Sequence, residues 1–264
     1  MKITKAILLT ILLIIMFYIP QGILILLYKK TELIGDRFQE HIYSVITLSY
    51  LIAYLIILYF LWKPKPNLKS VFNFSQLDLK LIPYLLLIVI GLGFVEQPFT
   101  EFDKIIEYYK TSELEPRSYR FAGFSWFFVY LNISSLLIAP IFEELFFRKF
   151  LFVKLLEKNN LWISIIVSSL CFAAIHFETP SNLIPTLIFG IIACMIYFKT
   201  QNIIYTILIH FFNNLCSSLY SIYGESFFQW VYGLEFGVMY WALFVFGILT
   251  TILAVKKITA ANNT

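Results

Sequence analysis

The sequence predicts an all-α, polytopic membrane helix bundle with about eight transmembrane helices. Three observations support this fold class. The 264 residues are 60% hydrophobic and 19% aromatic. Charged residues make up only 14% of the chain, against about 25% in a soluble domain. The apolar residues also gather in long runs, and a membrane-spanning helix needs about 20 of them in succession.

Eight apolar runs are long enough to span a membrane, and polar connections separate them. No internal repeat, low-complexity tract or Gly/Ser linker divides the chain. We therefore expect one integral membrane domain over residues 1–264. The predicted spans are 6–28, 43–62, 81–99, 123–147, 161–177, 183–199, 203–223 and 236–255.

The first run begins like a signal peptide, with Lys2 and Lys5 ahead of the apolar residues. It continues to about residue 28, which is longer than the apolar region of a signal peptide, and it shows no small-residue cleavage pattern. We expect it to be retained as the first membrane helix, kinked at Pro20.

Basic residues predict the orientation in the membrane. Thirteen of the 20 Lys and Arg residues fall on the side that holds both termini, and seven fall on the other. Because Lys and Arg concentrate in cytoplasmic loops, we expect both termini in the cytoplasm. The net charge of +4 then reflects orientation and contact with the lipid bilayer, and it does not indicate nucleic-acid binding. Abundant Ile, Lys, Asn and Phe are typical of an AT-rich bacterial genome, so we expect a bacterial plasma membrane.

The third connection, EFDKIIEYYKTSELEPRSYR, is the longest polar segment of the chain. Its residues Phe102, Ile105, Ile106 and Tyr109 recur at i, i+3, i+4 and i+7, which predicts a short amphipathic helix on the outer surface. We interpret this helix as a connector in preference to a lid over a substrate entry.

The three cysteines do not indicate disulfide or metal chemistry. Cys171, Cys194 and Cys216 lie inside apolar runs, are odd in number and show no C-x-x-C spacing. We expect them to behave as small core residues.

Four charges interrupt the end of the fourth apolar run, in the segment PIFEELFFRKF at residues 140–150. The apolar pattern continues through them to Leu156, so the sequence leaves the C-terminal end of this span open. A charged side chain at the centre of a membrane costs about 2.5 to 3.5 kcal/mol, so such residues pair, line a cavity or take part in chemistry. Glu144 and Arg148 are spaced i, i+4 with the acid first, which favours a helical ion pair. Glu143 points about 100° away around the helix and needs other partners. We interpret the Glu144–Arg148 pair as structural and Glu143 as the carboxylate left over.

Polar residues in the fifth and seventh runs are candidate partners for Glu143. His176 follows Phe172 by four residues, and His210 precedes Asn214 by four, so each pair shares one helix face. Counted from the turn that joins the fourth and fifth helices, Glu143 and His176 both lie about 24 Å away. His210 lies only about 13 Å from its own turn. That mismatch closes if the end of the fourth helix projects beyond the bilayer.

Each of these residues also has a plain structural interpretation. An intramembrane His is often a hydrogen-bonded packing residue, and Asn213 and Asn214 are of the type that joins membrane helices. A functional site is favoured because four polar groups recur on three spans of an otherwise apolar chain. These groups are Glu143, His176, His210 and Asn214.

The order of the three motifs resembles a known family. The motifs E-E-x-x-x-R at 143–148, F-x-x-x-H at 172–176 and H-x-x-x-N at 210–214 are similar to those of the CPBP (CAAX protease and bacteriocin-processing, or Abi) family. This family includes the type II CAAX prenyl endopeptidases. The resemblance covers about residues 123–220, which we expect to form the catalytic core.

The resemblance implies an intramembrane endopeptidase that hydrolyses a peptide bond in a membrane-associated or secreted peptide or protein. It implies that Glu143 is the general base that activates water, with the assistance of His176. His210 and Asn214 would hold the oxyanion of the tetrahedral intermediate. The residues implied to support the site are Glu144, Arg148 and Phe172.

A metal-dependent mechanism is the main alternative within this family, whose members have been described both as metallopeptidases and as glutamate-type peptidases. Two His residues and one carboxylate are a known catalytic zinc set, so Glu143, His176 and His210 are the candidate ligands. The sequence holds no H-E-x-x-H motif. We favour a mechanism that requires no cofactor, because it gives Asn214 a role as an oxyanion donor.

Two other function classes compete with a peptidase. One is a non-catalytic bacteriocin-immunity or regulatory membrane protein on the same scaffold. The other is a transporter, in which intramembrane acids and histidines mark a pathway. A transporter predicts internal symmetry and helices broken at matching positions, and the sequence shows neither. Nothing in the chain indicates a prenyl-binding groove.

Overall fold

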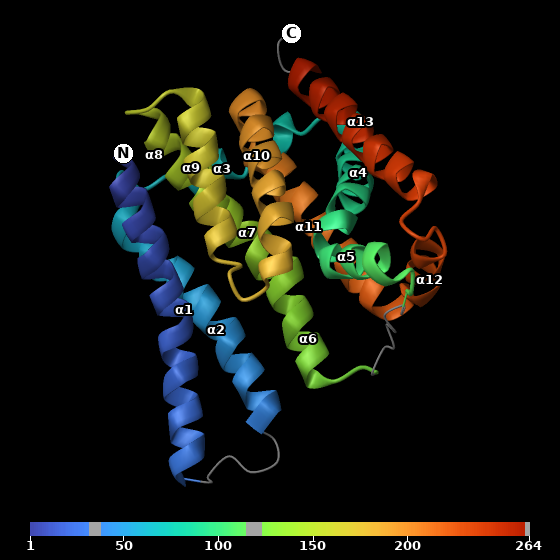
Figure 1. Ribbon diagram of the computed structural model, residues 1–264. Helices are drawn as coiled ribbons and strands as arrows, with labels where there is room; N and C mark the ends of the chain where they lie inside the picture. The colour runs from blue at the N-terminus through green and yellow to red at the C-terminus, as the bar shows by residue number, and fades with distance from the viewer. Residues whose placement is uncertain (32–37, 115–122, 262–264) are drawn as a thin grey trace.

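The computed structural model describes residues 1–31, 38–114 and 123–261. Within those ranges every regular element is helical, which confirms the predicted all-α bundle. The first two helices, α1 (Ile3–Thr31) and α2 (Phe38–Leu61), lie side by side at one edge of the molecule (Figure 1). Helix α1 continues through Pro20. Short elements follow α2, namely α3 (Leu68–Val71), η2 (Phe74–Gln76) and η3 (Leu79–Leu81).

The predicted fourth span differs from a simple helix. It is a continuous run of five helical segments, and two of them, η4 and η5, are π-helical. Such π segments are rare and occur often at functional sites. The run extends through the charged residues as far as Leu156, nine residues beyond the predicted end. Its segments are α6 (Trp126–Ile133), η4 (Ser134–Ile138), α7 (Ala139–Glu143), η5 (Glu144–Phe152) and α8 (Val153–Leu156).

Three helices pack around this run at the centre of the molecule. Helix α9 (Leu161–Ala174) begins after Asn160, whose side chain accepts a hydrogen bond from the Ile163 amide. A polar turn and η6 (Pro180–Asn182) lead into α10 (Leu183–Thr200). Helix α11 (Ile203–Tyr223) follows after a two-residue connection.

Helices α4 (Ile82–Thr100) and α13 (Val238–Ala261) form a pair on the other side of the centre (Figure 1). Their contact depends on two glycines. A Cβ atom added to Gly247 would lie 2.6 Å from the carbonyl oxygen of Gly91. Small residues allow membrane helices to approach this closely.

Helix α5 (Phe102–Thr111) is the amphipathic helix predicted for the third connection. Ile105 is buried against α12 (Glu225–Tyr232) and against the side chain of Phe236. The hydroxyl of Tyr109 also donates a hydrogen bond to the carbonyl oxygen of Phe236, at 2.8 Å. The remaining face residues, Phe102, Ile106 and Tyr109, are exposed. The last six residues of the predicted connection, 115–120, lie outside the described residues.

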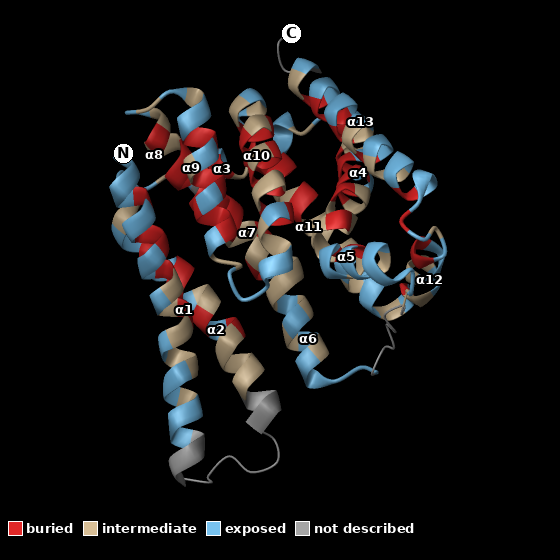
Figure 2. Ribbon diagram, viewed as in Figure 1, coloured by how far each residue is buried: buried red, intermediate tan, exposed pale blue. Residues whose placement is uncertain are grey.

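Six helices in the described ranges are long and apolar enough to cross a membrane: α1, α2, α4, α10, α11 and α13. The other two predicted spans are the segmented fourth run and α9, which has only 14 residues. The buried residues concentrate in the upper half of the bundle around α7, α9 and α10, whereas the lower parts of α1 and α6 are largely exposed (Figure 2).

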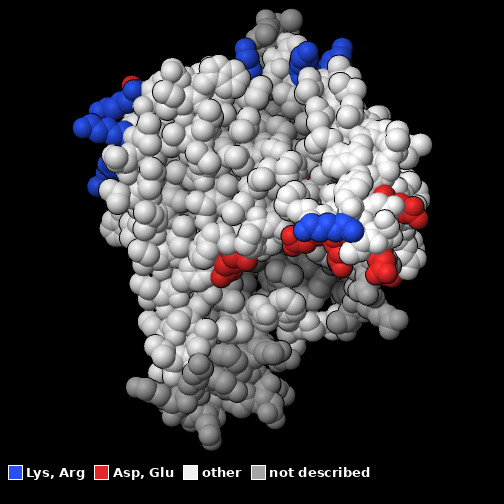
Figure 3. All heavy atoms as spheres, in the orientation of Figure 1, with Lys and Arg blue, Asp and Glu red and all other residues white. Residues whose placement is uncertain are grey.

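The termini and the charges are distributed unevenly. Helix α1 begins and α13 ends at the same end of the molecule (Figure 1). Figure 3 shows most of the visible Lys and Arg side chains at that end, and Asp and Glu side chains nearer the other.

Candidate active site

The predicted ion pair between Glu144 and Arg148 is present at the centre of the bundle. Arg148 Nη1 lies 3.1 Å from Glu144 Oε1, and both side chains are fully buried. The same carboxylate oxygen lies 2.9 Å from His210 Nδ1. Glu144 therefore links the fourth helical run to α11 as well as to its own helix. The sequence predicts only the first of these two contacts.

Phe172 supports the buried cation through its ring. The Arg148 guanidinium carbon lies 4.0 Å from the centroid of Phe172 and 5.6 Å from that of Phe189. Phe172 also meets the rings of His176 and His210 edge to face, at centroid distances of 5.1 and 6.0 Å. A desolvated cation over an aromatic face gains about 2 kcal/mol. Phe172 thus forms a wall shared by the ion pair and both histidines.

Glu143 is the carboxylate that the ion pair leaves over. It is the last residue of α7, and its side chain is 12% exposed. Its Oε2 atom lies 3.9 Å from His210 Nε2 and makes no hydrogen bond within the described part of the chain. A buried carboxylate oxygen without a donor is costly in a membrane interior. This cost is understandable if the oxygen takes part in chemistry.

His176 lies beyond the end of helix α9. The predicted fifth span, 161–177, therefore extends three residues past the last helical residue. Helix α9 ends at Ala174, and the turn that follows it carries His176. The Nδ1 atom lies 3.1 Å from the Phe172 carbonyl oxygen. Since a carbonyl can only accept, Nδ1 carries a proton and Nε2 is the nitrogen available to a ligand.

Asn214 lies one helical turn after His210 in α11. Its amide Nδ2 donates a 2.6 Å hydrogen bond to the backbone carbonyl of Ser135, in the π-helical segment η4. One N–H group of the amide therefore holds the fourth run against α11. The second N–H group and the amide oxygen can still serve a ligand.

One cavity brings together the four predicted site residues. This cavity, which we call the catalytic cavity, has a volume of about 260 Å³. Because a water molecule needs only about 10 to 15 Å³ on this measure, the cavity can hold several. Its lining includes Glu143, His176, His210 and Asn214, together with residues of α1, α2 and η4.

The contact between Glu143 and His210 places the fourth run and α11 level at the site. The predicted height mismatch of His210 is therefore absent. The end of the fourth run, around Lys154 and Glu157, carries an exposed ion pair of 2.6 Å.

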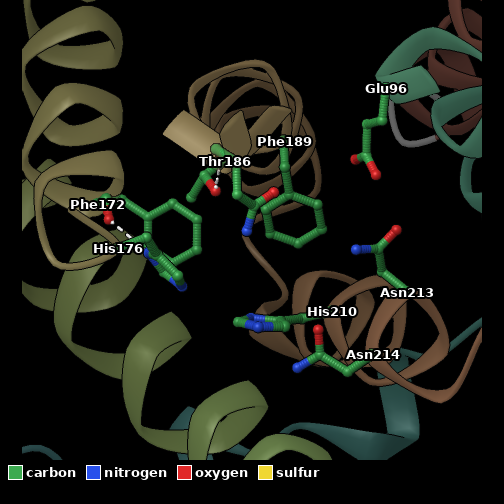
Figure 4. A pocket seen from close by; sticks show the side chains of 9 residues that line it. Glu96, Phe172, His176, Thr186, Phe189, His210, Asn213 and Asn214 are labelled. Atoms are coloured by element: carbon green, nitrogen blue, oxygen red, sulfur yellow. Dashed lines mark hydrogen bonds between the residues drawn. The ribbon is translucent and has the colours of Figure 1, made fainter. Parts of the chain in front are cut away.

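Two residues near the site were not identified from the sequence. The Tyr54 hydroxyl of α2 is buried without a hydrogen-bond partner in the described ranges, and its side chain lines the catalytic cavity with Glu143. Nothing in the apolar run around Tyr54 signals this position. Glu96 of α4 faces a smaller adjoining cavity with His176 and His210 (Figure 4). An acid inside the predicted span 81–99 was the signal that could have identified it.

The donor types of Glu143, His176 and His210 suit zinc, since both histidines present Nε2 and both Nδ1 atoms have acceptors. Their placement does not suit it. Within the described ranges, no three His, Cys, Asp or Glu side chains are grouped so that they could hold one metal ion. The mechanism proposed below therefore uses no metal ion, and zinc binding by these three residues remains the alternative prediction.

Fold and site together define a polytopic helical membrane protein in which buried Glu143 and His210 and half-buried His176 and Asn214 line one cavity. Residues 125–216 match the family model described as type II CAAX prenyl endopeptidase Rce1-like. This region of the chain is therefore similar to that family, as the three motifs predict, and the match extends from the fourth to the seventh predicted span. This similarity supports a membrane protease function.

Two curated bacterial proteins are similar to part of the chain. The Bacillus subtilis (strain 168) protein named "Putative membrane peptidase YdiL" is 33% identical over 82 residues, which are 31% of this chain and 33% of that protein. The "UPF0177 protein YxdF" of Lactococcus lactis subsp. lactis (strain IL1403) is 33% identical over 79 residues, 30% of this chain and 43% of that protein. The chain thus spans less than half the length of each relative. No solved structure matches the chain.

Proposed function

We propose that this protein is an intramembrane endopeptidase that uses a carboxylate-activated water molecule. One observation carries the proposal: the Glu143 carboxylate has an oxygen without a hydrogen-bond donor, in a cavity with room for water, beside two histidines. The membrane-embedded helices and the family match support the same activity.

Glu143 accepts a proton from the attacking water, and the resulting hydroxide adds to the peptide carbonyl carbon. His176 assists, because its Nδ1 proton is held by the Phe172 carbonyl and its Nε2 lone pair can accept a hydrogen bond from the same water. The proton then passes to the leaving nitrogen as the C–N bond breaks. A positioned base contributes about 10²- to 10⁴-fold to the rate.

His210 and Asn214 stabilise the oxyanion. His210 Nδ1 faces a carboxylate oxygen that can only accept, so Nδ1–H donates to Glu144. Donation from Nε2 to the oxyanion then requires a doubly protonated ring. The second N–H of the Asn214 amide is the other donor. Removal of one oxyanion donor costs about 10²- to 10³-fold in turnover.

Glu144 and Arg148 hold this arrangement. With His210 charged, the two carboxylates are balanced by two cations, so the buried cluster has no net charge. A balanced cluster costs far less in a membrane interior than an isolated charge. Glu144 fixes the orientation of the His210 ring, and Arg148 neutralises Glu144 without contacting the substrate.

The substrate is a peptide segment of a membrane-associated or secreted protein, which reaches the catalytic cavity from within the bilayer. We place the protein in a bacterial plasma membrane with both termini in the cytoplasm, because thirteen of the 20 Lys and Arg residues fall in the segments that the sequence assigns to that side. Lipid is its other partner.

The test is cleavage of a quenched fluorescent peptide library by protein in nanodiscs. Wild type is compared with Glu143→Ala, and with Glu157→Ala as a control from the exposed end of the same helical run. Cleavage should fall at least about 100-fold in Glu143→Ala only. Each protein is also assayed with a strong chelator and after addition of zinc.

Three outcomes are distinguishable. Cleavage that survives chelation and depends on Glu143 supports the glutamate-type mechanism. Loss on chelation with recovery in zinc assigns Glu143 and the two histidines to a metal. Absence of cleavage by folded wild-type protein contradicts the proposal and favours a non-catalytic immunity or regulatory protein.

A further inference from the structure

Three cavities meet at the active site. The catalytic cavity adjoins a central cavity of about 60 Å³, and the two share His176, Asn182, His210 and Asn214. A third cavity of about 250 Å³, which we call the α4 cavity, shares Asn182 and Asn214 with both of the others. The three cavities therefore adjoin one another in a row past the histidines, which we call the path, from the α1–α2 side of the bundle to the α4–α12 side.

Glu96 lines both the central cavity and the α4 cavity. It lies on the face of α4 that also carries Gly93 and Thr100, so that face follows the path for two helical turns. A Cβ atom added to Gly93 would meet nothing within 4 Å, which shows that this stretch of the path is open. In Figure 4 the Glu96 carboxylate points into the cavity toward Asn213, with His176 and His210 across from it.

Glu96 has no cationic partner among the residues that the structure describes. The ion pairs present there involve other acids, and the only side-chain bond near its backbone is from the Thr100 hydroxyl to the Glu96 carbonyl. This differs from Glu144, which faces Arg148 and His210. An acid in a membrane span costs about 2.5 to 3.5 kcal/mol and is retained for a ligand or a pathway.

We propose that Glu96 is a substrate-binding residue that selects a peptide carrying a positively charged nitrogen on one side of the scissile bond. The ligand chemistry is an ammonium or guanidinium group, from a Lys or Arg side chain or from the amino terminus of the peptide. The amides of Asn213 and Gln97, which line the α4 cavity, can accept further hydrogen bonds from that group. This inference rests on the proposed endopeptidase function, since it assigns the substrate of the same site.

The placement of Glu96 explains why it selects and does not catalyse. The catalytic cavity contains Glu143 and not Glu96, and the α4 cavity contains Glu96 and not Glu143. A peptide that follows the path therefore has its scissile bond at the histidines and its charged group beside α4. Helix α4 also lies outside the matched residues 125–216, so this selectivity comes from a part of the chain that the family match does not cover.

The experiment measures peptide binding in nanodiscs with a Glu143→Ala background, so that no peptide is cleaved. The probes are neutral decapeptides with one Lys scanned along the sequence, each paired with its norleucine counterpart, and each made with a free or an acetylated amino terminus. They are tested against Glu143→Ala alone, with Glu96→Gln added and with Glu107→Gln added. Glu107 is an exposed acid on α5 that lines none of the three cavities.

We expect Lys at one position, or a free amino terminus, to tighten binding about 10- to 100-fold over the uncharged partner. Glu96→Gln should bring that ratio close to one, and Glu107→Gln should leave it unchanged. The acetylated peptides separate the two sources of the charge. Glu96→Lys should favour the same peptides with Glu in place of Lys.

An equal affinity for Lys and norleucine peptides at every position overturns the inference, and so does a preference that survives Glu96→Gln. Because binding is measured without turnover, failure of the proposed peptidase activity would appear separately, as absence of cleavage by wild type. Comparable unfolding transitions of the variants exclude a loss of structure as the cause.

Discussion

Two contacts in the bundle hold neighbouring helices together in different ways. Around η5, α9 and α11, buried charges and hydrogen bonds join the helices, as in the contacts of Glu144 with Arg148 and His210. Between α4 and α13, glycines let the two backbones touch at Gly91 and Gly247. Lipid gives no hydrophobic advantage to helix association, so both polar contacts and close packing are needed. The polar contact also contributes residues to the candidate active site, whereas the glycine contact only packs α4 against α13.

The largest effect should follow from breaking the polar contact. Arg148→Ala leaves the Glu144 carboxylate buried without its cation, and we expect a loss of about 3 to 5 kcal/mol in the free energy of unfolding. The measurement is unfolding of the detergent-solubilised protein by a denaturing detergent. A double replacement, Glu144→Leu with Arg148→Met, should recover part of the loss, because it removes the uncompensated charge but also the acceptor of His210 Nδ1–H. No recovery would mean that the pair stabilises the bundle beyond balancing its own charge.

The glycine contact should be the next most sensitive. In Gly247→Ala the new methyl group would lie 2.6 Å from the Gly91 carbonyl oxygen and 2.9 Å from Phe94 Cβ, so α4 and α13 must separate. We expect a loss of about 1 to 3 kcal/mol by the same assay. Gly22→Ala is the control, since a Cβ there meets nothing within 4 Å. Equal stability of the two variants would show that the close approach contributes nothing.

A single neutral hydrogen bond between helices should contribute less. The Ser168 hydroxyl of α9 donates to the Phe147 carbonyl of η5 at 2.8 Å, whereas the Ser169 hydroxyl donates within α9 to Ile165 at the same distance. Ser168→Ala should destabilise by about 0.6 to 1.7 kcal/mol. Ser169→Ala, equally buried, should cost less because the one contact of its hydroxyl with another helix, to Cys194 Sγ of α10 at 4.0 Å, is to a weak sulfur acceptor. A larger effect at Ser169 would contradict this assignment.

The smallest effect is expected for Tyr54→Phe. The Tyr54 hydroxyl is buried and has no hydrogen-bond partner in the described ranges, so its removal leaves no other group unsatisfied. The ring stays packed against Phe17, Phe142 and Phe146. Stability should stay within about 0.5 kcal/mol of wild type. A loss above about 1 kcal/mol would reveal a partner for the hydroxyl.

Much of the fold follows from local sequence patterns. Long apolar runs predict spanning helices, and the i, i+4 spacing predicts the contact between Glu144 and Arg148, because both depend only on residues near one another in the chain. The contact of His210 with Glu144 could not be predicted. It depends on how α11 is rotated against the fourth run, and on two π-helical segments for which the sequence offers no clear signal.

The candidate site likewise combines features that the local sequence predicts with features that depend on how the helices pack. The motifs identify Glu143, His176, His210 and Asn214, and the structure brings all four to one cavity. The sequence could not indicate that the Asn214 amide also binds the Ser135 carbonyl, since the two residues are far apart in the chain. Glu96 could have been identified from the sequence, because a lone acid in a predicted membrane span is itself a signal of function. Tyr54 was not, because tyrosines are common in this chain.

The shortness of α9 has a consequence for the membrane itself. Fourteen helical residues extend about 21 Å, whereas the hydrocarbon core is about 30 Å thick. Irregular backbone at that depth persists only where it borders water or protein. The bilayer therefore has to thin beside α9, or water has to reach the turn that carries His176. Either way, this hydrophobic mismatch brings the aqueous phase to the candidate site, and turnover by the proposed peptidase should depend on lipid chain length.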